Sequence, residues 1–456
     1  MSDKLLAINS GSSSLKYKLF DMPSEHLILS GAYERLGNPN AAFRMNFKNF
    51  RASGALAVTS HEKAVDHLLN LLLNLHVVHS LDEIRGVGHR IAHGGEIFKH
   101  PVRVDQYVLQ TIDRLSDLAP MHNPVNAAGI RLFSEALPQA IQVAVFDTSF
   151  HQTMPAENYM YPIPYEYYEK YKIRKYGFHG TSHEYVAQEA AKILGRKITE
   201  LKIITCHLGN GSSICCIDRG KSIDTSMGFT PTAGLMMGTR SGDIDPTILT
   251  YLQRKLHLTV DETEEVINRK SGIMGVSGVS NDFRDVLAYA NKGDKRSILA
   301  IEMFTRRICS FIERYKSELG KLDALVFTAG IGEHSPFLRK KVCDKLKGLH
   351  IYLDLEKNEQ NGPMIQSEAS EPAVLVIPTD EELVIARETF HLLREAESPV
   401  IMTDQPVRNN LQVSSSLKER MIKADKCKRF LIKNTYNSSL QDENEGNQAG
   451  GTEYHQ

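Results

Sequence analysis

Hydrophobic and polar positions alternate with two different periods along most of this chain. Short apolar runs predict buried strands at residues 5–8, 84–87, 142–146, 203–207, 214–217, 324–328 and 373–377. Longer stretches with apolar residues every three or four positions predict helices at 61–76, 105–118, 125–136, 182–194, 246–256, 261–270, 294–319 and 382–396. Because strands and helices follow one another in turn, we expect an α/β fold.

The first strand leads into a turn of small residues, Asn9 to Lys16, with the sequence NSGSSSLK. One glycine and four serines leave backbone amides and hydroxyls open to an anion, and Lys16 adds a positive charge. The stretch is either a phosphate-binding turn or a serine-rich hairpin, and the absence of GxxxxGK[ST] excludes a Walker loop. Residues 207–213 repeat the pattern, with Ser212 and Ser213 in place of Ser13 and Ser14, which indicates two similar domains facing one nucleotide.

Composition narrows the class of protein. A chain of 456 residues predicts two domains, and a net charge of -1 gives no field that would recruit nucleic acid or a membrane. The N-terminus lacks the pattern of a signal peptide, and no apolar run approaches the length of a membrane span. The six cysteines have no metal-ligand spacing, so we expect reduced thiols in a cytoplasmic protein. Residues 398–456 are polar and predict a disordered tail, with at most a short amphipathic helix at 418–433.

Several polar side chains follow predicted strands. Arg90 lies at the end of one, beside glycines, as a surface ion pair or a site residue. His89 and His93 are four residues apart, but the missing Glu of HExxH and the following glycine pair argue against zinc. Asp147 stands just beyond strand 142–146, where open α/β folds place site residues, or it caps the next turn.

Three further stretches have the composition of functional loops. Residues 155–178, rich in Tyr and Pro, predict an irregular connection between domains. The connection ends at His179, whose place at a predicted helix N-terminus suits anion binding. Residues 225–246 are rich in Gly, Pro and Thr, with Arg240 as the sole cation, and residues 329–333 predict a glycine turn.

Ten motifs occur in order: NSGSSSLK, GHRIAHGGE, HNP, VFDTSFHQTMP, YGFHGTSH, HLGNGSS, GLMMGTRSGDIDP, NDFR, GIGE and PTDEE. Together, over about residues 4–396, they resemble the acetokinase family of acetate and propionate kinases. The resemblance implies two duplicated ribonuclease H-like domains of the actin and hexokinase type, with a nucleotide in the cleft between them. It places one domain at 1–150 plus 378–397 and the other at 151–377.

The resemblance also implies a set of site residues. Asn9 and Glu381 would position Mg²⁺, for which Mn²⁺ can substitute. The catalytic residues would be Arg90, Asp147, His179 and Arg240. The acyl substrate would contact Arg90, Ala92, Met121, His122, Phe178 and Pro231. ATP or ADP would contact Ser12, Ser14, Lys16, His207, Leu208, Gly209, Asn210, Gly211, Asp282, Phe283, Arg284, Gly330, Ile331, Gly332, Glu333 and His334. His334 replaces the family's usual Asn.

The activity that the resemblance implies is reversible, Mg²⁺-dependent, in-line phosphoryl transfer between ATP and acetate, giving acetyl phosphate and ADP for acetyl-CoA and acetate metabolism. A carboxylate substrate is already ionised at neutral pH, so Asp147 is expected to orient groups or organise the metal. Propionate kinase is the alternative, because Ala92 stands where acetate kinases commonly have Val. A non-catalytic nucleotide switch is a second alternative, but such proteins lack the acyl site formed by Arg90, His179 and Arg240. The family also implies a homodimer.

Overall fold

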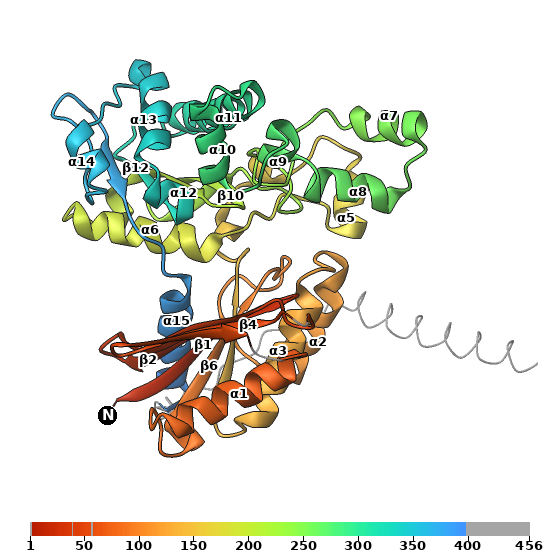
Figure 1. The fold of residues 1–456 in the computed structure, drawn as a ribbon, viewed down its shortest axis with the longest axis vertical. Helices are drawn as coiled ribbons and strands as arrows, with labels where there is room; N and C mark the ends of the chain where they lie inside the picture. The colour runs from red at the N-terminus through yellow and green to blue at the C-terminus, as the bar shows by residue number, and fades with distance from the viewer. Residues whose placement is uncertain (1, 39, 56–57, 398–456) are drawn as a thin grey trace, which may run out of the picture. The chain divides into compact units, whose positions relative to one another are not determined.

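The computed structural model describes residues 2–38, 40–55 and 58–397, which form two β-sheets with their helices (Figure 1). The predicted tail at 398–456, including Cys427 and stretch 418–433, lies outside the described residues. The other five cysteines are free and buried, as expected. Within these ranges no helix is long and apolar enough to cross a membrane.

The first sheet has the strand order β5-β4-β3-β2-β1-β6-β8-β7. Its strands are β1 (Asp3–Gly11), β2 (Ser14–Met22), β3 (His26–Glu34), β4 (Ala42–Phe47), β5 (Phe50–Ala55), β6 (Ile84–Ile91), β7 (Val102–Arg103) and β8 (Ile141–Phe146). Strands β1 and β2 form the predicted hairpin, while β1, β6 and β8 run parallel. The sequence pattern gave no prediction for β3, β4 and β5.

The second sheet has the order β11-β10-β9-β12-β13. Its strands are β9 (Lys202–Leu208), β10 (Ser212–Asp218), β11 (Lys221–Thr225), β12 (Ala324–Thr328) and β13 (Ala373–Val376). An antiparallel hairpin again adjoins two parallel strands, so β11-β10-β9-β12-β13 matches β3-β2-β1-β6-β8 in order and direction. The repeated pattern in the sequence therefore corresponds to a repeated sheet topology.

The helices surround the two sheets. They are α1 (His61–Asn74), α2 (Gln106–Arg114), α3 (Asn123–Ala136), α4 (Ala156–Tyr159), α5 (Tyr165–Tyr171), α6 (Gly180–Ile193), α7 (Thr247–Leu256), α8 (Val260–Arg269), α9 (Gly272–Ser277), α10 (Phe283–Asn291), α11 (Lys295–Leu319), α12 (Ala329–His334), α13 (Pro336–Lys345), α14 (Leu355–Glu359) and α15 (Glu381–Glu397). Ser60 caps α1, because its hydroxyl accepts a hydrogen bond from the Lys63 amide at 3.2 Å.

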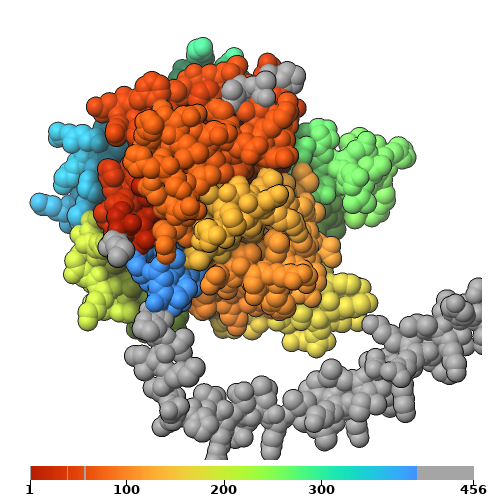
Figure 2. Space-filling model, turned by 90° about the horizontal axis from the view of Figure 1, so that it is seen from below, coloured from red at the N-terminus to blue at the C-terminus, as the bar shows by residue number. Residues whose placement is uncertain are grey.

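Helices α6 and α15 pack on different sheets, and only α15 lies on a sheet that is distant from it in the sequence. Helix α6 precedes β9 in the chain, and its Val186 and Ala190 pack against Ile203 and Val326 of the second sheet. Helix α15 comes after β13, yet it packs against β1 and β8 of the first sheet through residues such as Ile385. Figure 1 shows α15 beside β1 and β6, and Figure 2 shows its blue surface between red and orange segments of the first half of the chain. Helix α15 therefore ties the second half of the chain to the first sheet.

Three predicted elements need correction. Residues 155–178 are not wholly irregular, because they contain α4 and α5. The predicted glycine turn at 329–333 is helix α12, which the chain enters through a left-handed residue, Ala329, with φ 62°. Helix α6 begins at Gly180, two residues before the predicted start, after His179 with φ 57°. In contrast, the loop following β11 has neither helix nor strand until α7, as predicted.

Candidate functional site

The candidate residues of the first half lie at the carboxyl ends of three parallel strands. Asn9 is near the end of β1, Arg90 is near the end of β6, and Asp147 directly follows β8. The register places Ile8 beside His89 and Arg90 beside Val145. Parallel strands end at the same edge of a sheet, so three residues far apart in sequence meet there.

Arg90 is the centre of this group. Its Nε donates to Asp147 Oδ1 at 2.9 Å, its Nη2 donates to the other oxygen of Asp147, and its Nη1 donates to Asn9 Oδ1 at 3.4 Å. Glu381, the first residue of α15, lies 3.7 Å from Arg90 Nε. The Asp147 side chain is only 1% exposed. Arg90 therefore belongs to a partly buried cluster of polar side chains and does not form an ordinary surface ion pair.

The charge of this cluster is not balanced. Burial opposes ionisation of Arg90, but Asp147 and Glu381 outweigh it and raise the pKa of the guanidinium. Burial, opposed by Arg90 and reinforced by Asp147 and Glu382, raises the pKa of Glu381 to about 7. The single positive charge of Arg90 thus faces the carboxylates of both Asp147 and Glu381 and does not neutralise both. Among the described residues, no three His, Cys, Asp or Glu side chains are placed to hold a metal alone.

The second sheet brings another set of residues to its own carboxyl edge. His207 near the end of β9 pairs with Thr328 at the end of β12, and Thr379 follows β13. Ser182 Oγ lies 2.8 Å from both His207 Nδ1 and Thr379 Oγ1. The Thr379 amide donates to Glu333 at 3.1 Å. These bonds connect α6, β9 and α12 to the segment that leads into Glu381.

His179 stacks on His207, with ring centroids 4.1 Å apart, and its Nδ1 lies 2.9 Å from Ser213 Oγ. Burial lowers the pKa of His179 well below its usual range, and His207, His183, Arg90 and Arg240 lower it further. His179 is therefore a neutral imidazole at physiological pH. Its left-handed backbone conformation places it at the N-terminus of α6, as the sequence predicted.

Arg240 and His179 face the same glycine. A Cβ atom at Gly211 would lie 3.4 Å from Arg240 Nη1 and 3.6 Å from His179 Nε2. Arg240 donates weakly to the Pro231 carbonyl at 3.4 Å, and no ion pair joins it to a carboxylate within the described ranges. Burial lowers the pKa of this guanidinium. An unpaired, part-buried cation beside a neutral imidazole is suited to bind an anion.

The side chains of the first small-residue turn are open. Ser12 and Lys16 are exposed, and the two residues between β1 and β2 are Ser12 and Ser13. The His61 ring holds the turn from α1, with Nε2 2.8 Å from the Gly11 carbonyl oxygen. Backbone and hydroxyl groups at this turn remain accessible to a ligand.

The second turn, His207 to Gly211, is braced by backbone contacts. Ser212 Oγ donates to the Gly209 carbonyl at 2.9 Å, and the Gly238 amide donates to the Asn210 carbonyl at 2.9 Å. A Cβ at Gly238 would come within 1.7 Å of Asn210 Oδ1, so the loop before Arg240 requires glycine here. Leu208 is fully buried and belongs to the hydrophobic core of the second sheet, so it supports the turn from within.

The remaining nucleotide candidates differ in exposure. Asp282 caps α10 and pairs with Arg284, whose side chain is 89% exposed. Phe283 is buried and packs against Phe304, so only its backbone is available. Position 330 in α12 faces open space, since nothing lies within 4 Å of a Cβ built there. Ile331, Gly332, Glu333 and His334 complete that helix.

The acyl candidates surround Arg90 and Arg240. Burial lowers the pKa of His122, and the charges of Arg90 and Arg240 lower it further, so His122 lies near both. Ala92 is buried and its amide donates to Asn126 Oδ1 at 3.0 Å. Phe178 is buried against Met227 and Met237. Met121 is 53% exposed, and the Pro231 carbonyl accepts from Arg240.

Sequence reasoning missed the residues that support these side chains. Ser182, His183, Thr205, Ser213 and Thr379 are fully or largely buried and bonded to one another or to the candidate histidines. The signal available was the position of Ser182 and His183 inside YGFHGTSH. Nothing in the sequence paired them with Thr205 or Ser213 on other strands.

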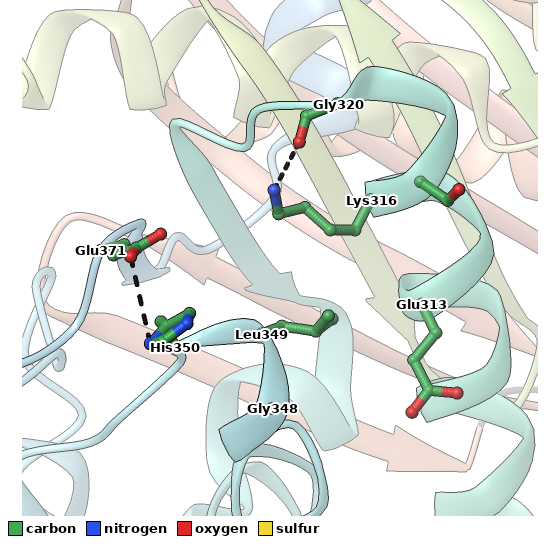
Figure 3. A pocket seen from close by; sticks show the side chains of 8 residues that line it. Glu313, Lys316, Gly320, Gly348, Leu349, His350 and Glu371 are labelled. Carbon is green, nitrogen blue, oxygen red and sulfur yellow. Dashed lines mark hydrogen bonds and ion pairs between the residues drawn. The ribbon is translucent and has the colours of Figure 1, made fainter.

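A surface hollow of about 310 Å³ lies elsewhere, between the end of α11 and the segments that precede β12 and β13. Figure 3 shows Lys316 bonded to the Gly320 carbonyl and His350 facing Glu371 on its wall. The hollow is at the amino ends of the parallel strands and contains none of the candidate residues.

Comparison with known proteins gives a consistent result. The Acetokinase family matches residues 4–387. Acetate kinase 2 of Listeria monocytogenes is 50% identical over 385 residues, which cover 84% of this chain and 97% of that protein. The crystal structure of Porphyromonas gingivalis acetate kinase has a TM-score of 0.81 at 41% identity, covering 86% of this chain and all of that one. A Francisella tularensis propionate kinase has a TM-score of 0.81 at 42% identity, covering 85% and 99%.

Proposed function

Because this chain belongs to the acetokinase family, we propose that it is an acetate kinase, which transfers a phosphoryl group reversibly between ATP and acetate. The products are ADP and acetyl phosphate. The Listeria acetate kinase is 50% identical to this chain and the Francisella propionate kinase 42%, so acetate is favoured over propionate.

The observation that carries the proposal is the convergence of Arg240 and His179 on Gly211. Both groups approach within 3.6 Å of one point, and neither Arg240 Nη nor His179 Nε2 is used by a carboxylate of the described chain. A nucleotide switch without an acyl substrate has no need of an unpaired, part-buried guanidinium there. The arrangement favours a kinase over the non-catalytic alternative.

Phosphoryl transfer needs positioning and charge more than covalent chemistry, because the charge in its loose transition state spreads over the equatorial oxygens. We assign Arg240 and His179 to those oxygens, and Arg90 to the acetate carboxylate and the transferring group. Asp147 fixes the Arg90 guanidinium through two hydrogen bonds. Acetate is already ionised, so Asp147 acts by orientation and not as a base.

We include Mg²⁺ in the proposal. Asn9 Oδ1 and the carboxylates of Asp147 and Glu381 are hard oxygen donors of the kind that Mg²⁺ prefers, and Mg²⁺ usually combines one or two carboxylates with water and substrate phosphates. Burial is the main cause of the raised pKa of Glu381, and the nearby carboxylates of Asp147 and Glu382 raise it further against the opposing effect of Arg90. When bound, Mg²⁺ would supply positive charge that offsets the charge of the phosphates. Asn9 and Glu381 would hold it, and Asp147 would organise its surroundings.

ATP or ADP completes the site. We propose that the phosphates lie against Ser12, Ser14 and Lys16 and against the turn from His207 to Gly211. The nucleoside would rest on the segment from Asp282 to Arg284 and on α12, where the position of Gly330 is open. The acetate methyl group would lie near Ala92, Met121, His122, Phe178 and Pro231.

The domain division, assembly and location are part of the same proposal. Residues 1–150 and 378–397 form one domain and 151–377 the other, supported by the packing of α15 on β1 and β8. A homodimer is supported by α7, which has no buried residue and exposes Ile248, Tyr251 and Leu256. Five free, buried cysteines are typical of a cytoplasmic protein.

Trapping of the acyl phosphate tests the function. Purified protein with ATP, Mg²⁺, acetate and hydroxylamine should form acetohydroxamate, and propionate should react with lower kcat/KM. Arg240→Ala should lower kcat by about 10²–10³-fold, the usual loss for one transition-state donor. Arg307→Ala, which removes an arginine that donates to the Asp243 carbonyl at 2.9 Å, is the matched control and should retain activity. ATP binding without hydroxamate would favour the nucleotide switch instead.

A further inference from the structure

Behind His179 lies a buried chain of hydrogen bonds that starts at Thr205 on β9. Thr205 Oγ1 is 2.7 Å from His183 Nδ1, and His183 Nε2 is 2.8 Å from Ser213 Oγ. Ser213 Oγ is in turn 2.9 Å from His179 Nδ1. Thr205, His183 and Ser213 are fully buried, so water does not provide alternative partners.

Counting hydrogens gives this chain a direction. Both histidines are neutral, because burial lowers their pKa well below the usual range, so each ring carries one N–H. Ser213 has a single hydroxyl hydrogen and contacts a nitrogen of each ring. It can donate to one ring only, and it must accept from the other.

Thr205 decides which ring donates. Its hydroxyl has His183 Nδ1 as its sole hydrogen-bond partner in the described chain. If Thr205 donates, His183 carries its hydrogen on Nε2 and donates to Ser213, and Ser213 donates to His179 Nδ1. In the opposite direction, the buried Thr205 hydroxyl hydrogen has no acceptor, which costs free energy.

We propose that Thr205, His183 and Ser213 are positioning residues that hold His179 as the Nε2–H tautomer, aimed at the transferring phosphoryl group. The catalytic role given to His179 here rests on the proposed function, whereas the hydrogen-bond chain and the tautomer do not. Nε2 is the nitrogen of His179 that approaches Gly211 beside Arg240, together with the adjacent Cε1 carbon. In this tautomer it donates a hydrogen bond to a phosphoryl oxygen, whereas the other tautomer presents a lone pair that repels the oxygen.

The same count of hydrogens fixes the tautomer of a second histidine, His151, which holds the backbone before His179. His151 Nε2 lies 3.0 Å from the Phe178 carbonyl oxygen, which can only accept, so His151 carries its hydrogen on Nε2. Its Nδ1 then accepts from Ser222 Oγ at 2.8 Å. Both the ring of His179 and the peptide before it are held by fully buried groups.

The experiment reads the tautomers directly. Protein labelled with ¹⁵N-histidine is studied at pH 7 by long-range ¹H–¹⁵N NMR, and His179→Gln and His183→Gln assign the signals. We expect both rings to be neutral with the proton on Nε2. A proton on Nδ1 of His179, or a doubly protonated ring, overturns the proposal, and this measurement needs no variant of Thr205.

Thr205→Val and Thr205→Ser provide the kinetic arm. Valine has the shape of threonine but removes the hydroxyl that fixes the direction, so both tautomers of His179 should be populated. We expect kcat to fall about two- to tenfold with KM for acetate and ATP unchanged, and serine to retain the wild-type kcat. Unchanged tautomers and kcat in Thr205→Val overturn the role of Thr205. An Nε2–H signal in a protein that forms no acyl phosphate would instead contradict the proposed function.

Discussion

At the scale of single residues, Arg90 explains how one edge of a sheet becomes a site. Its guanidinium contacts Asp147 and Asn9 and lies near Glu381, which come from three separate elements. The buried Asp147 fixes the direction of the guanidinium, and the surplus negative charge remains available for a cation. The charge and the geometry around Arg90 therefore depend on the Asp147 carboxylate more than on any other group.

Asp147→Asn tests this dependence. The amide keeps the size of the side chain but loses its charge and one of the two acceptors for Arg90. We expect the Mg²⁺ concentration for half-maximal activity to rise about 10–100-fold, the usual effect of removing a group that supports a metal site. The measurement is a Mg²⁺ titration of the initial rate.

Asp113→Asn is the matched control, because that carboxylate pairs with Arg131 on the surface. It should leave the Mg²⁺ titration unchanged. Loss of activity in Asp147→Asn with an unaltered Mg²⁺ titration would contradict the metal-organising role.

At the scale of elements, α6 and α15 form the joint between the two halves of the chain, since α6 packs on the second sheet and the adjacent α15 packs on the first. Arg387 on α15 lies 3.8 Å from Glu189 on α6 and pairs with Glu25 after β2. Glu184 on α6 and Glu388 on α15 repel each other, and burial together with this repulsion raises the pKa of Glu184 to about 7. The joint thus contains one attractive and one repulsive pair.

Glu184→Gln should stabilise the protein at pH 8. A raised pKa means that the folded state binds the proton more tightly than the unfolded chain between about pH 4.5 and 7. The free energy of unfolding therefore falls as pH rises through this window and stays lower above it. Glutamine removes that loss, worth about 1–3 kcal/mol at about 1.4 kcal/mol per pKa unit.

Urea unfolding at pH 8 and pH 5 measures the effect, with the exposed Glu264→Gln as control. The gain should shrink towards pH 5. An equal gain at both values would show that charge at Glu184 is not its cause.

Arg339 stabilises the end of helix α12 through hydrogen bonds. It is fully buried and forms no ion pair with a carboxylate of the described residues, and burial lowers its pKa to about 10. Its Nη1 donates to the carbonyls of Gly332 at 2.8 Å and Glu333 at 2.9 Å, and its Nε donates to Asn358 at 2.8 Å. The guanidinium thus joins the end of α12 to α14.

Arg339→Met should lower the free energy of unfolding by about 3 kcal/mol, because an unsatisfied buried polar group costs about 1–3 kcal/mol. It should also raise the KM for ATP, since α12 is part of the proposed nucleotide site. Denaturant unfolding and ATP kinetics measure both, and Arg306→Met at an exposed position of α11 is the control. A destabilised variant with an unchanged KM for ATP would show that α12 does not contribute to nucleotide binding.

The sequence predicted those elements whose pattern is local and missed those that depend on distant partners. Helix α1 and its Ser60 cap follow from apolar spacing and a single hydroxyl. Helix α12 was predicted as a turn because Gly330 and Gly332 have low helix propensity, whereas Arg339 satisfies its last carbonyls. The sequence could not predict the chain of hydrogen bonds from Thr205 to His179, since its members come from three elements that only the fold brings together.

At the scale of the whole molecule, two sheets with the same strand order each bring their carboxyl ends to a set of site residues. Asn9, Arg90 and Asp147 come from the first sheet, and His207 and Thr328 come from the second. The electrostatic effect of Arg90 reaches His179 and His207. The duplicated topology therefore supplies both halves of one site.

A chain that ends after residue 397 should retain wild-type kcat/KM within about twofold, because the family match and every candidate residue lie within residues 4–387. Initial rates of the truncated and full chains, compared at equal protein concentration, test this. A loss beyond tenfold would mean that residues 398–456 contribute to activity.

The central claim is direct, reversible phosphoryl transfer between acetate and the nucleotide, and ³¹P NMR follows it without coupling enzymes. Acetyl phosphate, ADP and Mg²⁺ are mixed with the purified full chain, and Arg240→Ala is run beside it. We predict that the acetyl phosphate signal declines as the γ-phosphate signal of ATP grows in equal amount, and that Arg240→Ala slows both about 10²–10³-fold. Inorganic phosphate appearing in place of ATP, or no change in a sample that binds ADP, would contradict the account.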